Sequence, residues 1–87
     1  MTYRIRFTPA AQKQILRLDK PVALRIRAYV EGLNLENPRL VGTPLSGESG
    51  LWRYRVGDYR MLVSIHDDEL MVLVVIVDHR RQVYRGL

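Results

Sequence analysis

The chain opens with hydrophobic and polar positions that alternate one by one over residues 3–7. This period of two is typical of a strand with one face on the core. Thr8 and Pro9 then predict a helix start, with the threonine as N-cap and the proline at the first helical position, where its missing N–H costs nothing. We expect this first helix to end near Leu18.

A second helix is predicted to begin at Asp19-Lys20-Pro21 and to end at Gly32. Its apolar residues recur at helical spacing and would form one stripe against the core: Val22, Ile26, Tyr29, Val30 and Leu33. Residues 38–50 show little pattern, so we expect them to form a loop.

Three strand-like segments follow, over residues 51–56, 59–66 and 70–77. Gly57-Asp58, between the first two, has the length and composition of a two-residue hairpin turn. The last segment is apolar on both faces, as a central strand would be. The order of elements predicts an α+β fold: a small antiparallel sheet of about four strands, with an N-terminal helical hairpin packed on one face.

The length of 87 residues accommodates a single domain, which we assign to residues 1–87. Because the chain has no cysteine, disulfides and thiolate zinc sites are excluded, and no histidine or carboxylate cluster indicates another metal. The longest apolar run, residues 70–77, is too short to span a bilayer, which needs roughly 20 residues. We therefore expect a cytoplasmic protein without membrane contact and without a cofactor.

The net charge of +5 indicates a polyanionic partner. The basic residues are 12 arginines and 2 lysines, and arginine offers a planar fork of donors that suits phosphate. A coding bias toward arginine would give the same ratio, so composition indicates only the sign of the partner's charge. Lys13 and Arg17, on the outer surface of the first helix, are candidate RNA contacts; the alternative is a solvated helix face.

The Gly57-Asp58 turn predicts the register of the hairpin, with Arg55 directly opposite Arg60 and Arg53 two residues away on the same face. Like charges opposed across two strands are destabilising, by a few tenths to about 1 kcal/mol. The sequence therefore predicts that an anion sits among the three arginines. The alternative is that their long side chains splay apart into water. If the two cations repel, removal of Arg60 would leave the stability of the fold unchanged or slightly raised.

The C-terminal segment adds basic and polar side chains after the buried strand: His79, Arg80, Arg81, Tyr84 and Arg85. Histidine titrates near neutral pH and suits proton transfer, and a tyrosine hydroxyl can donate to a phosphate. Strict alternation after Val77 would place His79 and Arg81, rather than Arg80, on the face of Arg55. The alternative is a solubilising or docking tail without a role in a site.

Taken together, three motifs of the chain resemble the RelE branch of the RelE/ParE toxin superfamily. They are Leu45-x-Gly47, Leu51-Trp52-Arg53-x-Arg55-x-Gly57-Asp58-Tyr59-Arg60 and Val77-Asp78-His79-Arg80-x-x-Val83-Tyr84-Arg85. The opening strand and two helices also fit, so the resemblance covers essentially the whole chain. It implies a small sheet packed by two helices, and a toxin that is inhibited by a cognate antitoxin wrapping over it as a hetero-oligomer.

The resemblance also implies that the protein enters the ribosomal A site and cleaves messenger RNA there. The ribose 2′-OH would attack the adjacent phosphate without a metal ion, leaving a 2′,3′-cyclic phosphate and a 5′-OH. By position, the resemblance assigns catalytic roles to Arg53, Arg55, Arg60, Arg80 and Tyr84, with His79 as a further candidate and Arg81 and Arg85 as RNA contacts.

The chain departs from the family at Arg53 and Arg55, where relatives often carry lysine. An arginine is a poor general base because its guanidinium stays protonated. Glu48 and His79 are the candidate substitutes. Fold alone does not separate this nuclease from a ParE-like toxin that inhibits DNA gyrase, or from an inactive relative that only binds RNA. The joint presence of the arginines and Tyr84 favours the nuclease.

Overall fold

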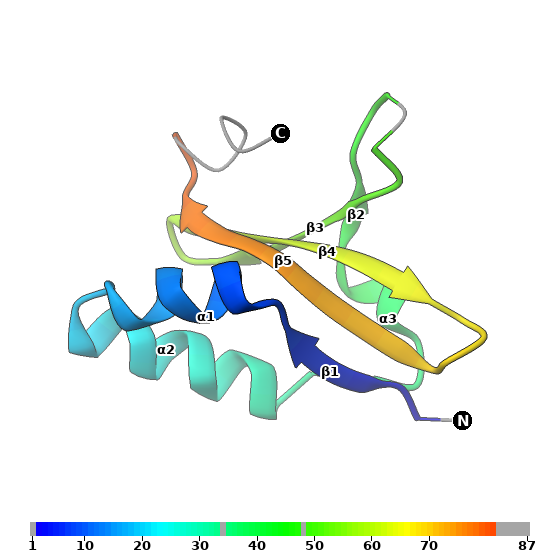
Figure 1. Cartoon of the computed structure of the whole chain (residues 1–87), viewed down its shortest axis with the longest axis horizontal. Helices are drawn as coiled ribbons and strands as arrows, with labels where there is room; N and C mark the ends of the chain where they lie inside the picture. The colour runs from blue at the N-terminus through cyan, green and yellow to red at the C-terminus, as the bar shows by residue number, and fades with distance from the viewer. Residues whose placement is uncertain (1, 34, 48, 82–87) are drawn as a thin grey trace.

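The computed structural model describes residues 2–33, 35–47 and 49–81. The elements in chain order are β1 (Arg4–Phe7), α1 (Pro9–Leu16), α2 (Lys20–Glu31), α3 (Pro38–Val41), β2 (Thr43–Pro44), β3 (Trp52–Val56), β4 (Tyr59–His66) and β5 (Met71–His79). Figure 1 shows α1 and α2 side by side against the sheet, with β1 leading directly into α1. In the described part of the chain, no helix is long and apolar enough to cross a membrane.

The strands form one sheet in the order β1-β5-β4-β3-β2. The predicted α+β class and the helical hairpin are confirmed, and the meander β3-β4-β5 is antiparallel as expected. Two details differ from the expectation of about four antiparallel strands. The first strand pairs in parallel with β5, from which three helices and the strands β2, β3 and β4 separate it along the chain. The predicted loop over residues 38–50 contains α3 and the two-residue strand β2, which is too short to show a period.

The first helix begins as its sequence predicts. The Thr8 hydroxyl accepts a hydrogen bond from the Ala11 N–H at 3.1 Å, and Pro9 occupies the first turn. The regular helix ends at Leu16, two residues before the predicted end. The second helix also has a proline in its first turn. Its N-cap residue, Asp19, makes no side-chain hydrogen bond to the helix backbone.

The core lies between the two helices and one face of the sheet. Its buried members come from α1, α2 and the three long strands: Ala11, Ile26, Tyr54, Val56, Met61, Val63, Val72, Val74 and Val77. The Tyr54 hydroxyl donates to the carbonyl oxygen of Pro38 at 2.7 Å, which fastens α3 to this face. Burial raises the pKa of Tyr54 to about 12, so its hydroxyl stays a donor throughout the physiological range.

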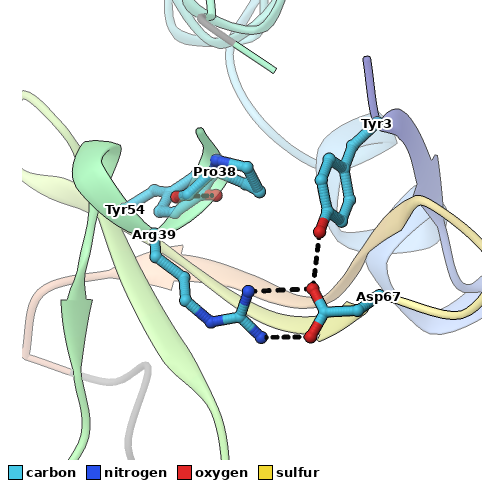
Figure 2. Close-up of polar contacts among 5 residues, drawn as sticks. All are labelled: Tyr3, Pro38, Arg39, Tyr54 and Asp67. Carbon is cyan, nitrogen blue, oxygen red and sulfur yellow. Dashed lines mark hydrogen bonds and ion pairs between the residues drawn. The ribbon is translucent and has the colours of Figure 1, made fainter. Parts of the chain in front are cut away.

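A charged network closes the far end of the fold, where Figure 2 shows Arg39 and Tyr3 directed at the same carboxylate. Arg39 donates two hydrogen bonds to the oxygens of Asp67 at 2.8 and 2.9 Å, and the Tyr3 hydroxyl donates a third at 2.6 Å. The Arg39 guanidinium also lies 6.0 Å from the centre of the Trp52 ring. The network joins α3, the start of β1 and the β4–β5 turn, which are distant in sequence.

This network makes the stability of the fold sensitive to acid. The hydrogen bonds from Arg39, and next those from Tyr3, lower the pKa of Asp67 from 3.8 to about 2. A depressed carboxyl pKa stabilises the fold above the unfolded value of 3.8 and loses this contribution as the pH falls through about 2. We therefore expect Asp67→Asn to lower the thermal midpoint at pH 7, with the difference from wild type shrinking between pH 4 and pH 2.

Thermal unfolding of both proteins over this pH range measures the effect. The matched control is Asp68→Asn at the neighbouring exposed turn position, which should leave the midpoint at pH 7 close to that of wild type. A difference between Asp67→Asn and wild type that stays constant down to pH 2 would contradict the assignment of the network to the charged carboxylate.

Candidate functional site

The β3–β4 hairpin has the register that the turn predicts. Val56 pairs with Tyr59, and Arg55 lies directly opposite Arg60. Gly57 takes a positive φ of 59°, which glycine adopts without the strain that a side chain would bring. The predicted opposition of two arginines at the start of the hairpin is therefore confirmed.

The arginines project from the face of the sheet opposite α1 and α2, which we call the open face. Paired residues point to the same side of a sheet, so Arg53, its partner Leu62 and the Arg55–Arg60 pair share this face. Leu62 is fully buried, yet it is not part of the core cluster beneath the helices. Arg55 is exposed, and its guanidinium makes no hydrogen bond or ion pair within the described residues. It is therefore available to an external anion.

Arg60 is not the free cation that the sequence predicts. Its residue is only 9% exposed, and its Nη1 donates to the carbonyl oxygens of Gly57 at 2.8 Å and Tyr59 at 2.9 Å. The guanidinium thus folds back on its own turn, where backbone acceptors offset the repulsion from Arg55. These hydrogen bonds argue against the expectation that removal of Arg60 leaves stability unchanged, because the side chain joins the two ends of the hairpin turn.

We expect Arg60→Ala to lower the free energy of unfolding by about 1–3 kcal/mol, since it removes buried charge-assisted hydrogen bonds to two carbonyls. Urea-induced unfolding of the purified chain measures this. Arg60→Lys should recover only part of the loss, because an ammonium cannot reproduce the position of the fork. A midpoint of Arg60→Ala equal to that of wild type would show that these bonds contribute nothing to stability.

A bulge in β5 decides which side chains of the C-terminal end reach the open face. Val63 pairs with Val74, but Leu62 pairs with Ile76, so the register shifts by one residue between them. As a result Asp78 lies opposite Arg60, and His79 lies opposite Tyr59 on the helix-covered face. The expectation that strict alternation places His79 on the face of Arg55 is wrong for this reason.

His79 is held at the end of β5 by its neighbours. Its ring contacts the ring of Tyr59 edge-on, with 5.6 Å between their centres. The Arg81 N–H donates to Nδ1 of His79 at 3.3 Å, and the His79 N–H donates to the Asp78 carboxylate at 2.7 Å. The imidazole is therefore oriented, but it faces away from Arg55.

Arg80 follows β5 and is drawn to the hairpin turn. Its N–H donates to the Asp58 carbonyl oxygen at 2.7 Å, and its guanidinium lies 3.7 Å from the Asp58 carboxylate. Arg81 is exposed beside it. The structure thus brings Arg80, rather than Arg81, to the turn that carries Arg55 and Arg60, as the family resemblance implies. The predicted residues Tyr84, Arg85 and Glu48 lie outside the described residues.

The predicted RNA contacts Lys13 and Arg17 lie elsewhere. Both are exposed at α1, which packs on the opposite face of the sheet from Arg55. The structure does not bring them together with the arginine cluster. Among the described residues, no group of three or more histidine or acidic side chains is placed to hold a metal ion.

Two sets of residues at this site were missed in the sequence. The carboxylates Asp58 and Asp78 lie among the arginines, one in the turn and one opposite Arg60. Arg4 and Arg6 of β1 also point to the open face, because their β5 partners Met71 and Leu73 do so. The alternation of residues 3–7 could have indicated Arg4 and Arg6, because the polar residues of such a strand point away from the core.

The arginine cluster can bind an anion, but its guanidinium groups cannot act as proton acceptors. Arg55 and the half-buried Arg53 project from one end of the open face, and Arg80 lies at the adjacent hairpin turn, where Arg60 hydrogen-bonds to the backbone. Such preorganised donors stabilise negative charge that develops on a bound phosphate. Guanidinium groups do not accept protons, so a base must come from a carboxylate or imidazole nearby.

Comparisons with known proteins give a consistent assignment. The sequence model of the family described as "ParE toxin of type II toxin-antitoxin system, parDE" matches residues 5–84. Toxin RelG of Mycobacterium tuberculosis is 34% identical over 98% of this chain and 99% of its own length. Toxin RelE of the same organism is 32% identical over 95% of this chain and 87% of its own length.

Solved structures agree with the sequence relatives. The toxin–antitoxin complex RelBE2 from Mycobacterium tuberculosis contains a chain that matches with a TM-score of 0.82 and 32% identity, over 92% of this chain and 100% of that one. A free mutant of the Escherichia coli toxin RelE matches with a TM-score of 0.78 over 98% of this chain and 93% of that one, and at 24% identity it supports the fold. The chain therefore belongs to the RelE branch of the RelE/ParE superfamily, the toxins of type II toxin–antitoxin systems.

Proposed function

We propose that this toxin cleaves messenger RNA in the ribosomal A site and so stops translation in the cytoplasm. The observation that carries the proposal is the exposed Arg55 on the face that the helices leave open, with Arg53 on the same face and Arg80 at the adjacent hairpin turn. The two curated relatives are named RelG and RelE, which favours the RelE-type activity over inhibition of DNA gyrase.

The reaction would be an in-line transfer at phosphorus. The ribose 2′-OH loses its proton and attacks the adjacent phosphorus, the bond to the 5′-oxygen breaks, and that oxygen leaves as a 5′-OH after protonation. The products are a 2′,3′-cyclic phosphate and a free 5′-OH. Negative charge accumulates on the phosphoryl oxygens in the transition state, where Arg53 and Arg55 would stabilise it. Arg60 contributes by holding the turn beneath them.

Proton transfer falls to the end of β5. Asp78 lies opposite Arg60 on the open face, so its carboxylate is better placed than His79 to accept the 2′-OH proton. Arg80, held against Asp58, would stabilise the charge on the leaving 5′-oxygen, which takes its proton from solvent, and Tyr84 would orient the base or phosphate. Asp78→Asn and His79→Gln separate the two candidate bases by their effects on the pH profile of cleavage.

We also propose that a cognate antitoxin holds the toxin inactive as a hetero-oligomer. An apolar groove of about 450 Å³ runs along α2 beside β1 and α1, and it includes the 52%-exposed Leu24. An amphipathic helix of the partner would fit such a groove. RelE chains of Mycobacterium tuberculosis and Pyrococcus horikoshii were solved as toxin–antitoxin complexes. Co-expression should yield a stable complex without toxicity.

Induction of the toxin alone tests the function. Pulse labelling should show protein synthesis falling before DNA synthesis, and mapping of RNA 5′ ends should show new cuts within translated messages. These cuts should disappear when initiation of translation is blocked beforehand. If DNA synthesis falls first and gyrase-linked breaks appear, the ParE-like alternative is correct and the cleavage proposal fails.

A further inference from the structure

The open face carries a second pair of arginines, at the opposite edge from the hairpin turn. Arg4 pairs with Met71 and Arg6 with Leu73, and these two residues in turn pair with His66 and Ser64 of β4. Paired residues share a side, so Arg4 and Arg6 point to the same face as Arg53 and Arg55. The alternate residues of β1, Ile5 and Phe7, pack against the core beneath the helices.

Both arginines are exposed cations without an internal counter-charge. Within residues 2–33, 35–47 and 49–81, no side-chain hydrogen bond or ion pair involves Arg4 or Arg6. By contrast, Arg27, Arg39 and Arg80 each lie within 4.0 Å of a carboxylate oxygen. Charged residues on an edge strand also discourage aggregation, and that role alone would need no particular face or partner.

The open-face positions between the two arginine groups are largely apolar. The strands β5 and β4 separate β1 from β3, and three spacings of about 4.8 Å give a separation of roughly 14 Å across the sheet. The two groups are also displaced along the strands, because Arg6 is level with Ser64 and Arg53 with Leu62. The intervening open-face positions are the half-buried Met71, Leu73 and Ile76 and the buried Leu62. Ser64 and His66 lie beside them and hydrogen-bond to each other at 2.8 Å.

We infer that Arg4 and Arg6 form a second phosphate-binding subsite, which holds the same RNA strand at least about 14 Å across the sheet from the arginines at the bond that is cut. This inference rests on the proposed function, because it extends the path of the same RNA from the Arg55 end of the face. Guanidinium forks at both edges match the repeated phosphates of a single strand, and the apolar strip between them accommodates the faces of unpaired bases. The subsite would add affinity and orientation without taking part in the chemistry.

Binding of RNA to the full-length toxin tests the subsite directly. The probes are fluorescent 2′-O-methyl oligonucleotides of increasing length, which cannot be cleaved because the attacking hydroxyl is blocked. We expect Arg4→Gln/Arg6→Gln to bind long oligonucleotides roughly 10-fold more weakly than wild type, and to bind the shortest ones equally well. The slope of log affinity against log salt should fall by about 1.4, or about 0.7 for each lost phosphate contact with a single strand.

The matched control is Lys20→Gln/Arg27→Gln, which removes the same charge from exposed positions of α2 in the helix layer. This variant should bind every oligonucleotide like wild type. Equal weakening by both double variants would show a general effect of net charge and would overturn the subsite. So would weakening that is the same at every length, or no weakening at all.

The outcomes also separate this subsite from the proposed function. Loss of antitoxin binding by Arg4→Gln/Arg6→Gln with unchanged RNA binding would assign the surface to the protein partner and refute the subsite. If wild type makes no cuts in messages, the cleavage proposal fails by itself. The length-dependent binding difference would still be observed if Arg4 and Arg6 hold phosphate.

Discussion

Replacing Arg55 with alanine should reduce messenger RNA cleavage by about 10²–10³-fold, the usual cost of removing one preorganised donor from developing charge. The fold should keep its stability, within about 0.5 kcal/mol, because this side chain is exposed and makes no polar contact in the described part of the chain. Removing it also relieves its opposition to Arg60. Growth after induction, 5′-end mapping and urea unfolding measure the two effects separately.

Arg55→Lys and Arg27→Ala are the informative controls for this prediction. The lysine variant keeps a point charge without the fork, so it should restore only part of the activity. Arg27 is an exposed arginine of α2 that pairs with Glu31 at 3.0 Å, and its loss should leave cleavage unaffected. Full toxicity of Arg55→Ala would place the anion site elsewhere on the molecule.

The largest loss of stability is expected from Gly42→Ala. A Cβ atom at this position would lie 2.5 Å from the Tyr54 ring and 2.7 Å from the carbonyl oxygen of Arg53. The ring is fully buried and fastened to Pro38, so it cannot move aside without breaking the 2.7 Å hydrogen bond. Overpacking of this kind costs about 2–3 kcal/mol, which lowers the thermal midpoint of a chain this size by roughly 10–20 °C.

Gly32→Ala is the matched control for this substitution. A Cβ atom at Gly32 would meet its nearest neighbour, the Ala28 carbonyl oxygen, at 3.5 Å, which is ordinary contact. The φ of Gly32 is −94°, so alanine fits the backbone, and the midpoint should be unchanged or slightly higher. Equal thermal midpoints for Gly42→Ala and wild type would contradict this prediction, because they would show that α3 and the Tyr54 ring can shift at little cost to make room for the Cβ atom.

Features encoded by neighbouring residues could be predicted from the sequence. The helix start at Thr8 follows from an N-cap and a proline, which act within one turn. The register that opposes Arg55 and Arg60 follows from a two-residue turn between alternating strands. The family also followed from the sequence, because its motifs lie on the hairpin and the β5 end.

The positions and contacts of individual side chains at the site could be found only from the tertiary structure. The bulge between Val74 and Ile76 was invisible in a strand that is apolar on both faces, since a slip of one residue exchanges one hydrophobic side chain for another. It moves His79 off the open face and brings Asp78 to it. The return of the Arg60 guanidinium to the Gly57 carbonyl likewise depends on the three-dimensional shape of the turn.

The sequence by itself determined the elements, the hairpin register and the sign of the charge, because each depends on residues a few positions apart. Only the tertiary structure decided which arginines from distant strands share a face. Arg4 and Arg53 come together on the open face through the parallel pairing of β1 with β5. That pairing joins segments more than 60 residues apart, and its free energy comes from core packing that no local pattern encodes.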